Sequence, residues 1–211
     1  PALAVDHHPA EIDLPTGYWR SGGDFVSAFA TESFIDELAQ AAGIDPFSCR
    51  MAMLAGQPRL ARCLSTATAL GGWQGGGAGT GQGIACHASR GSFVAVLAEA
   101  RLDGDRVRVD RLVAVADVGR MIHPDIVRQQ IEGGLLFGMA AAVAAPVSIA
   151  AGLAGPRRLG DLRLPRLADS PEVTVELVAS KAEPGGASEV AVPPVAPAIA
   201  NALFAATGRR F

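Results

Sequence analysis

The chain has 211 residues, of which 49% are hydrophobic and 18% are charged, a composition typical of globular proteins and not of disordered ones. Its formal net charge of -3 at pH 7 provides no basic surface for nucleic acid, so we expect no nucleic-acid partner. No uninterrupted apolar run reaches the roughly 18–20 residues that a membrane span needs, so no span is expected.

The first half of the chain is expected to be helical. Residues 1–23 are polar and rich in Pro and Gly, which predicts an extended leader. From Asp24 to Ala42 the apolar side chains recur at helical spacing, and Gly43 then suits a left-handed end of that helix. The apolar positions expected to face the core are Phe25, Ala28, Phe29, Ile35, Leu38, Ala39 and Ala42.

Two shorter helices and a glycine loop complete this segment, which spans residues 24–83. Asp45 and Pro46 are typical of the N-cap and first residue of a helix, here expected to end near Leu54. A third helix is predicted from Leu60 to Gly71, followed by the loop GGWQGGGAGTGQG over residues 71–83.

The second segment, residues 84–211, is expected to begin with a hairpin. Its strands are predicted at Phe93–Leu102 and Arg106–Val115, joined at Asp103-Gly104, a strong hairpin signal.

A helix from Pro124 toward Ala145 comes next, and residues 150–171 show no regular pattern. A strand at 173–179, a glycine turn and a last helix at Val195–Thr207 end the chain. Helices with a largely antiparallel sheet and no regular βαβ alternation predict an α+β fold.

Several patterns exclude common sites. Cys49, Cys63 and Cys86 are odd in number and widely spaced, which favours buried thiols over disulfides or zinc. The histidines, at positions 7, 8, 87 and 123, show no metal-ligand spacing, so no metal bound by protein side chains is expected. The glycine loop lacks a P-loop ending and a dinucleotide-binding register, which favours a connector; a small-molecule-binding module built on this loop remains an alternative.

The stretch PGGASEV, residues 184–190, places one acid between a predicted strand and a predicted buried helix. Glu189 would be desolvated there, which disfavours its charged form unless it is paired. From the residues alone, a satisfied core or helix-terminal acid and a ligand-facing site are equally supported. Gly185 and Gly186 favour the site slightly, because bare backbone allows close approach of a ligand.

Three stretches in the same order resemble one family. They read GYWRSGGDFVSAFATESFIDELAQAAGIDPFSCRMAML (17–54), ADVGRMIHPDIVRQQIEGGLLFGMAAAV (116–143) and PGGASEVAVPPVAPAIANALFAATGRR (184–210). They are similar to the large subunits of molybdenum hydroxylases in the xanthine oxidase and aldehyde oxidase superfamily, of the isoquinoline 1-oxidoreductase β-subunit type. The chain would be the carboxy-terminal portion, residues 1–211, of such a molybdopterin-binding subunit.

The resemblance implies roles for the matching positions. Glu189 matches the active-site base, Gln130 a glutamine near the metal's oxo ligand, and Arg20 an arginine lining the cofactor side of the site. The backbone that would pack against the cofactor is Gly185, Gly186, Ala187 and Ser188. The implied reaction is hydroxylation of an N-heteroaromatic carbon or an aldehyde with oxygen taken from water.

The resemblance also implies a cofactor and partners. The cofactor would be molybdopterin of the cytosine dinucleotide type, bound by the full subunit and absent from this chain alone. The partners would be the amino-terminal part of the same subunit and an iron–sulfur small subunit, and the fragment could form a homo-oligomer. Either a cytoplasmic or a periplasmic, bacterial-type soluble enzyme fits this pattern.

The turn departs from the family at one point. The family's G-E-P-G is here Ser188-Glu189-Val190-Ala191, which adds side chains beside the acid. An alternative interpretation is therefore a non-catalytic structural or assembly domain that keeps the family core and has lost the molybdenum site.

Overall fold

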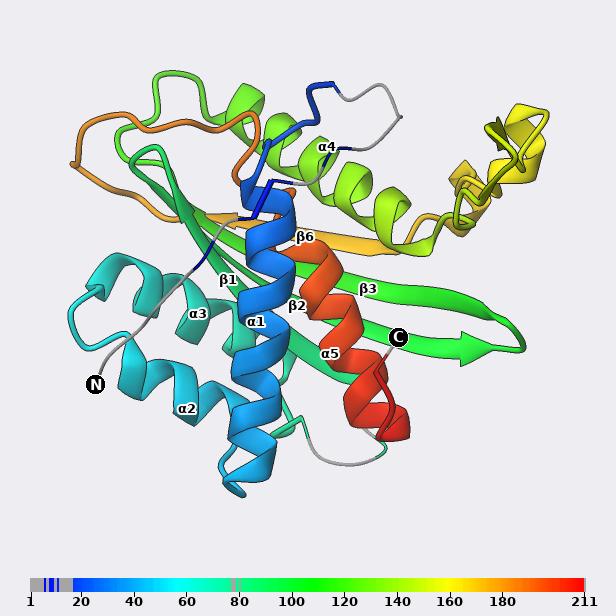
Figure 1. The fold of residues 1–211 in the computed structure, drawn as a ribbon. Coiled ribbons are helices and arrows are strands. Elements are labelled where there is room, and N and C mark those ends of the chain that lie inside the picture. Colours follow the sequence, from blue (N-terminus) through cyan, green and yellow to red (C-terminus); the bar gives the residue numbers. More distant parts are fainter. Residues whose placement is uncertain are drawn as a thin grey trace.

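A four-stranded mixed sheet lies at the centre of the molecule (Figure 1). In the computed structural model, which describes residues 6, 8, 9, 11, 17–76, 79 and 81–210, the strand order is β1-β2-β3-β6. β1, β2 and β3 are antiparallel, whereas β6 runs parallel to β3, so the predicted α+β class with a largely antiparallel sheet is confirmed. The strands are β1 (Gln82–Ser89), β2 (Ser92–Asp103), β3 (Arg106–Asp117) and β6 (Glu172–Leu177).

Five α-helices in the described residues surround this sheet, and all five fall where the sequence predicts them. They are α1 (Asp24–Ala41), α2 (Pro46–Met53), α3 (Pro58–Gly71), α4 (Pro124–Val143) and α5 (Val195–Thr207). The stretch 150–171 is mostly irregular, as expected, with short elements only: β4 (Ile149–Ala150), β5 (Leu153–Ala154), η1 (Leu159–Leu162) and η2 (Leu167–Asp169). Most of the leader predicted at 1–23, including His7, lies outside the described residues.

The helix ends follow the local chemistry. The Asp45 carboxylate accepts a hydrogen bond from the backbone N–H of Ser48 at 2.8 Å and so caps α2. Gly43 and Gly72 have φ values of +67° and +65°, the left-handed conformation that glycine adopts without strain.

β1 is the one strand of the central sheet that the sequence analysis misses. Its residues, QGIACHAS, are mostly small and contain a single β-branched side chain, so they show no alternation typical of strands. Pairing with β2 from Gln82 to Ser89 and close contact with α5 decide the conformation instead. At Gly83 an added Cβ would lie 2.2 Å from the backbone nitrogen of Ala202, which shows how closely β1 and α5 approach.

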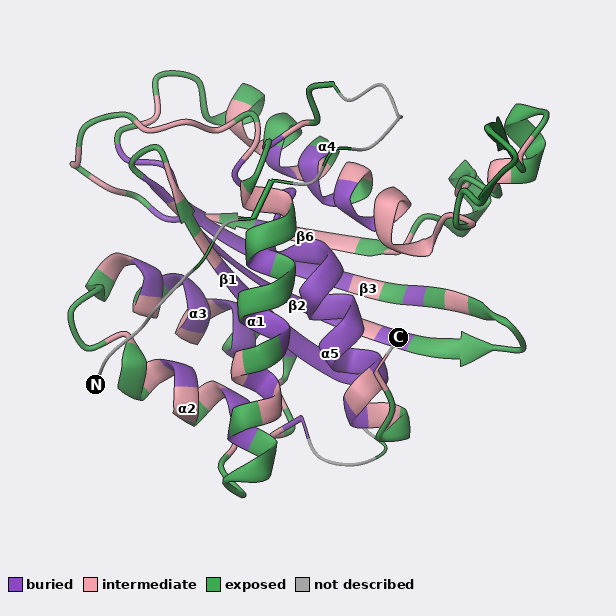
Figure 2. Cartoon of the chain, viewed as in Figure 1, coloured by how far each residue is buried: buried purple, intermediate pink, exposed green. Residues whose placement is uncertain are grey.

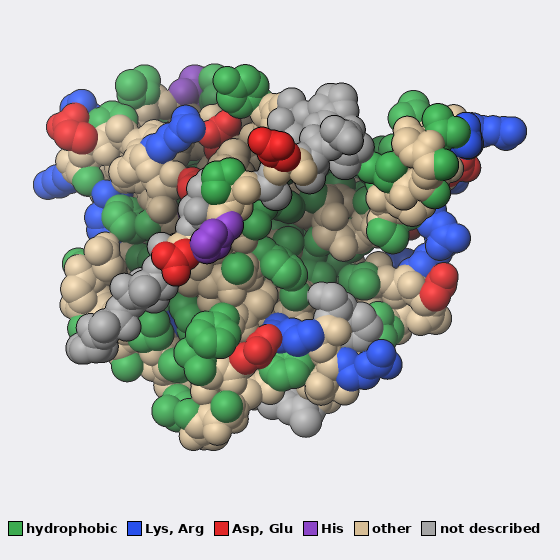
Figure 3. Space-filling model, in the orientation of Figure 1, with side chains coloured by type: hydrophobic (Ala, Val, Ile, Leu, Met, Phe, Trp, Pro, Cys, Tyr) green, Lys and Arg blue, Asp and Glu red, His purple; other side chains and the backbone are tan. Residues whose placement is uncertain are grey.

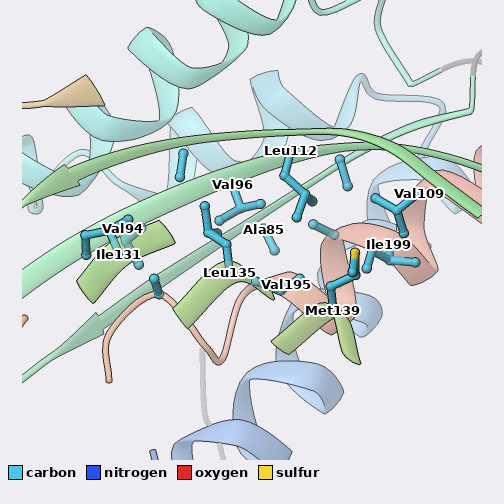
Figure 4. Close-up of a cluster of buried hydrophobic side chains, with 14 of the residues drawn as sticks. Ala85, Val94, Val96, Val109, Leu112, Ile131, Leu135, Met139, Val195 and Ile199 are labelled. Atoms are coloured by element: carbon cyan, nitrogen blue, oxygen red, sulfur yellow. The ribbon is translucent and has the colours of Figure 1, made fainter. Parts of the chain in front are cut away.

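Helices cover both faces of the sheet, so the middle of the sheet is buried on two sides, whereas the tip of the β2–β3 hairpin is exposed (Figure 2). α4 and α5 cover one face, where Leu135 and Ile199 pack with Val96 and Leu112 in the core shown in Figure 4. α3 covers the other face, where Leu64 packs in a second cluster with residues of β1, β2 and β3. Burial of each such side chain contributes about 1.5–3 kcal/mol to the free energy of unfolding.

α1 forms as predicted, but of its expected core positions only Ala28 and Ala39 are buried. The residues it buries are Ala28, Glu32, Ser33, Asp36 and Ala39. Phe29 and Leu38, expected in the core, are exposed, and hydrophobic side chains reach the surface along the face that α1 crosses (Figure 3). Helical spacing identifies an apolar stripe, but it does not say whether the fold covers that stripe.

Candidate functional site

The PGGASEV turn lies between β6 and α5 and is docked on one end of the central sheet. The backbone N–H of Gly185 donates to the carbonyl of Val118 at 2.8 Å, just past the end of β3. The backbone N–H of Gly186 donates to the carbonyl of Arg90 at 3.0 Å, in the tight turn between β1 and β2. The end of β3 and the β1–β2 turn, which lie at the same end of the sheet, therefore fix the backbone that leads into Glu189.

The two glycines of this turn are needed for packing within the chain. A Cβ on Gly185 would lie 2.3 Å from Ser92 Oγ and 2.8 Å from the carbonyl carbon of Gly91. A Cβ on Gly186 would lie 3.3 Å from the Cβ of Arg90. The sequence favours a ligand next to this bare backbone, but residues of the β1–β2 turn occupy the space instead.

Arg20 connects two other site residues predicted from sequence, Ser188 and Gln130. Its Nε donates to the carbonyl of Ser188 at 2.8 Å, and its Nη2 also donates to this oxygen. The same Nη2 donates to Gln130 Oε1 at 3.3 Å, so the guanidinium bridges α4 and the PGGASEV turn. Residues that are 110 and 168 positions apart from Arg20 in the chain thus meet at one place.

Aromatic rings support the guanidinium of Arg20. Its Cζ lies 5.8 Å from the centroid of the Phe137 ring, and the Trp19 ring lies 5.1 Å from the same ring and 5.9 Å from that of Phe25. An aromatic face within about 6 Å attracts a guanidinium and restricts its motion. Arg20 therefore sits in a defined position between the turn and α4.

Glu189 is less buried than its position in the sequence suggests. Its side chain retains 34% exposure, and Oε2 lies 3.3 Å from Arg90 Nη2. The expectation of a fully desolvated acid is therefore wrong for this chain, because the carboxylate lies at the surface beside an arginine.

A small cavity of about 30 Å³ adjoins Glu189. Among the residues that line it, the Ser21 hydroxyl is buried and has no hydrogen-bond partner within the described residues. The cavity also contacts Asp24, whose Oδ2 accepts a hydrogen bond from Ser89 Oγ at 2.7 Å and lies 3.4 Å from His87 Nε2. Burial lowers the pKa of His87 below its ordinary value, and the nearby Asp24 carboxylate opposes this shift.

Arg90, Ser21, Asp24 and His87 are the site neighbours that sequence reasoning did not assign to the site. Arg90 and Gly91, with φ values of +50° and +78°, form the two-residue turn between β1 and β2. The Arg-Gly pair between two strands could have indicated a hairpin turn, but β1 itself has no recognisable pattern.

The other candidates from sequence do not form sites in the described part of the chain. No group of three or more His, Cys, Asp or Glu side chains there could hold a metal ion, and the three cysteines are free thiols. Burial raises the pKa of Cys63 to about 12, so it is not a reactive thiol. In the glycine loop, Trp73 Nε1 donates to Asp45 at 2.9 Å and the Trp73 ring fills the space beside Gly76, whereas residues 77, 78 and 80 lie outside the described ones.

None of the helices in the described residues combines the length and the apolar character needed to cross a bilayer.

Fold and site together define an α+β domain that presents an acid, an amide and a hydroxyl beside one end of its sheet. Residues 68–171 match the family model of a molybdopterin cofactor-binding domain. The chain is 30% identical over 99% of its length to the beta subunit of isoquinoline 1-oxidoreductase from Brevundimonas diminuta, and 32% identical over 92% to a nicotinate dehydrogenase subunit from Pseudomonas putida (strain KT2440). It spans 28% and 18% of the lengths of these two relatives.

A solved structure agrees with the fold. A copper- and molybdenum-containing carbon monoxide dehydrogenase matches 56% of this chain and 16% of its own chain with a TM-score of 0.50 and 22% identity, a likeness that concerns the fold alone. The chain thus resembles subunits of molybdenum-dependent oxidoreductases, and residues 68–171 match the molybdopterin cofactor-binding domain family.

The polar groups at the turn suit one wall of a cofactor site. The unpartnered Ser21 hydroxyl, the Gln130 amide and the half-exposed Glu189 carboxylate can donate to and accept from a polar group, which a buried apolar wall cannot do. The cavity of about 30 Å³ holds roughly one water molecule and is far too small for a pterin. The residues present therefore fit the cofactor as one side of its site.

Proposed function

We propose that this chain is part of a molybdenum-dependent oxidoreductase subunit that hydroxylates N-heteroaromatic or aldehyde substrates with oxygen derived from water. The observation that carries the proposal is the meeting of Arg20, Gln130 and the Glu189 turn, three motifs far apart in the sequence. The names of the relatives, an isoquinoline oxidoreductase and a nicotinate dehydrogenase, support N-heteroaromatic substrates.

Each side chain has a distinct role in this proposal. Glu189 accepts a proton from the nucleophile as general base, a role that contributes about 10²–10⁴-fold to rate. The Gln130 amide lies on the same side of the cofactor site as Glu189. Arg20 donates to the Ser188 carbonyl and so fixes the backbone next to Glu189. Molybdopterin, when bound, supplies the redox chemistry, while the protein provides orientation and proton transfer.

The remainder of the site belongs to other parts of the assembly. Because the chain spans less than a third of its curated relatives, the opposite wall would come from the remaining part of the same subunit. An iron–sulfur small subunit would take the electrons, and the cofactor would be of the cytosine dinucleotide type. The chain alone would then be inactive.

Purified parent enzyme tests this proposal. We expect molybdenum and pterin in equal amounts with the subunit, and turnover of N-heterocycles or aldehydes that incorporates ¹⁸O from labelled water. Parent enzyme without molybdenum, or with product oxygen taken from O₂, would contradict the proposal.

A second candidate function is a non-catalytic structural or assembly domain, favoured by the packing of the turn. Val190 and Ala191 are buried in the main core, where the family pattern has proline and glycine. The double substitution Ser188→Gly and Val190→Pro in the parent subunit separates the two functions. Activity that appears only in the double variant indicates a decayed site, whereas activity already present in the unmodified subunit rules out the structural role.

A further inference from the structure

Arg90 stands closest to the proposed base among the cationic side chains of the described residues. Its Nη2 lies 3.3 Å from Glu189 Oε2, and no other ion pair of Glu189 is found in the described part of the chain. Arg90 belongs to the β1–β2 turn, some 100 residues before Glu189 in the sequence. The contact therefore depends on the docking of two separate turns.

The contact between the β1–β2 turn and the PGGASEV turn makes the Arg90 side chain lie along the PGGASEV turn. The carbonyl of Arg90 accepts from Gly186, and an added Cβ at Gly186 would lie 3.3 Å from Cβ and 3.6 Å from Cδ of Arg90. The aliphatic part of Arg90 thus runs over the bare glycine, in a space that any other residue would narrow. Its guanidinium ends beside the carboxylate of Glu189.

The pair contributes little to the stability of the fold. Arg90 is 73% exposed, and exposed ion pairs have small effects on stability because water and salt screen them. The two turns are already joined by backbone hydrogen bonds, which do not need the guanidinium. Stability therefore does not explain why Arg90 lies over Gly186 with its guanidinium beside Glu189.

We propose that Arg90 is a positioning residue for Glu189: its guanidinium holds Oε2, so that Oε1 is left in a fixed direction as the proton acceptor. This inference rests on the proposed function, because it concerns the same acid.

The charged groups around the pair are few in the described residues. Asp24 at the start of α1 and His87 in β1 line the same cavity, and Arg20 acts on the backbone of Ser188. Arg90 alone forms an ion pair with Glu189 there, so its removal changes the surroundings of the carboxylate most directly.

Kinetics of the parent holoenzyme provide the first test. In R90A we expect kcat to fall by up to about 10²-fold, since misplacement of a catalytic group by about 1 Å has an effect of that size, with KM little changed. R90K, which keeps a cation at this position, should restore part of the lost kcat. The matched control is R101A, which removes an exposed arginine paired with Asp110 on the β2–β3 hairpin and should leave the kinetics unchanged.

A kcat in R90A like that of the unmodified enzyme would overturn the inference. A loss of kcat no larger than the accompanying loss of bound molybdenum would also overturn it, because Arg90 would then act only on assembly. If the unmodified holoenzyme shows no molybdenum-dependent turnover, the proposed function fails instead, and the second test still applies.

The second test needs no activity. In the 211-residue chain, ¹⁵N NMR of arginine side chains should show slowed rotation or hydrogen exchange for the Arg90 guanidinium, which E189Q abolishes and E183Q, a substitution of another acid close to the turn, leaves unchanged. A guanidinium that is equally mobile with Glu and Gln at position 189 would contradict the pairing.

Discussion

At the scale of single residues, the least expected feature is a buried ionic cluster under α1. Arg50 Nε lies 2.9 Å from Glu32 Oε2, and Arg50 Nη1 lies 3.2 Å from Asp36 Oδ1. Burial raises the pKa of both carboxyls, while Arg50 opposes that shift. The cluster connects α1 to α2, and Glu32 also accepts from the backbone of Cys86 in β1 at 3.1 Å.

Removal of the cation from this cluster should destabilise the chain strongly. R50M leaves two carboxylates buried without their partner, which should lower the free energy of unfolding by about 3–5 kcal/mol in a urea titration. R101M breaks an exposed pair of similar length, 2.9 Å, and should cost less than about 1 kcal/mol. Equal losses of unfolding free energy in R50M and R101M would show that the buried cluster stabilises the fold no more than an exposed ion pair does.

His87 gives a prediction on pH. Burial lowers its pKa in the folded state, so at pH values below the ordinary pKa of about 6.5 the unfolded chain binds the proton more readily. The resulting stability is fully present above that pH and is lost as the pH falls through the lower, folded-state value. H87Q should therefore lose less stability between pH 7 and pH 5 than the unmodified chain, and parallel curves of unfolding free energy against pH would refute this.

At the scale of elements, α4 offers a matched pair of glycines. A Cβ at Gly138 would lie 2.8 Å from the carbonyl oxygen of Val192 and 2.9 Å from the Cβ of Val195, whereas nothing lies within 4 Å of a Cβ at Gly133. G138A should destabilise by about 1–3 kcal/mol through overpacking, and G133A should stabilise by up to about 1 kcal/mol through helix propensity. Thermal unfolding measures both changes in stability. Changes of the same sign in G138A and G133A would contradict the close contact of Gly138 with Val192 and Val195.

The helices were predictable because local signals mark their ends. Features that depend on contacts between distant segments were not predictable from the sequence. Asp45-Pro46 and the glycines after α1 and α3 determine helix ends with their own atoms, so sequence sufficed. β1 takes its strand conformation from β2 and α5, and the buried face of α1 depends on Arg50. The proposed site follows the same rule. Sequence motifs predict Arg20, Gln130 and Glu189 as site residues, but the position of Arg90 beside Glu189 depends on the contact between two distant turns and is seen only in the structure.

Over the whole molecule, the chain contributes one wall of the proposed site and encloses almost none of it. The space beside Glu189 is about 30 Å³, and hydrophobic side chains of α1 such as Phe29 and Leu38 stand exposed. We expect the isolated 211-residue chain to bind no stoichiometric molybdenum or pterin after expression in a cofactor-producing host. Elemental analysis checks this, and one molybdenum per chain would show that the rest of the subunit is not needed.

Glu189 is the proposed general base of a molybdopterin-dependent hydroxylase, and its substitution by glutamine separates that role from cofactor binding. E189Q keeps the size of the side chain and its place on the turn but removes the proton acceptor. In the parent holoenzyme the variant should lose turnover by at least about 10²-fold while its molybdenum and pterin contents stay near those of the unmodified enzyme. Turnover retained in E189Q at full cofactor content would contradict the claim.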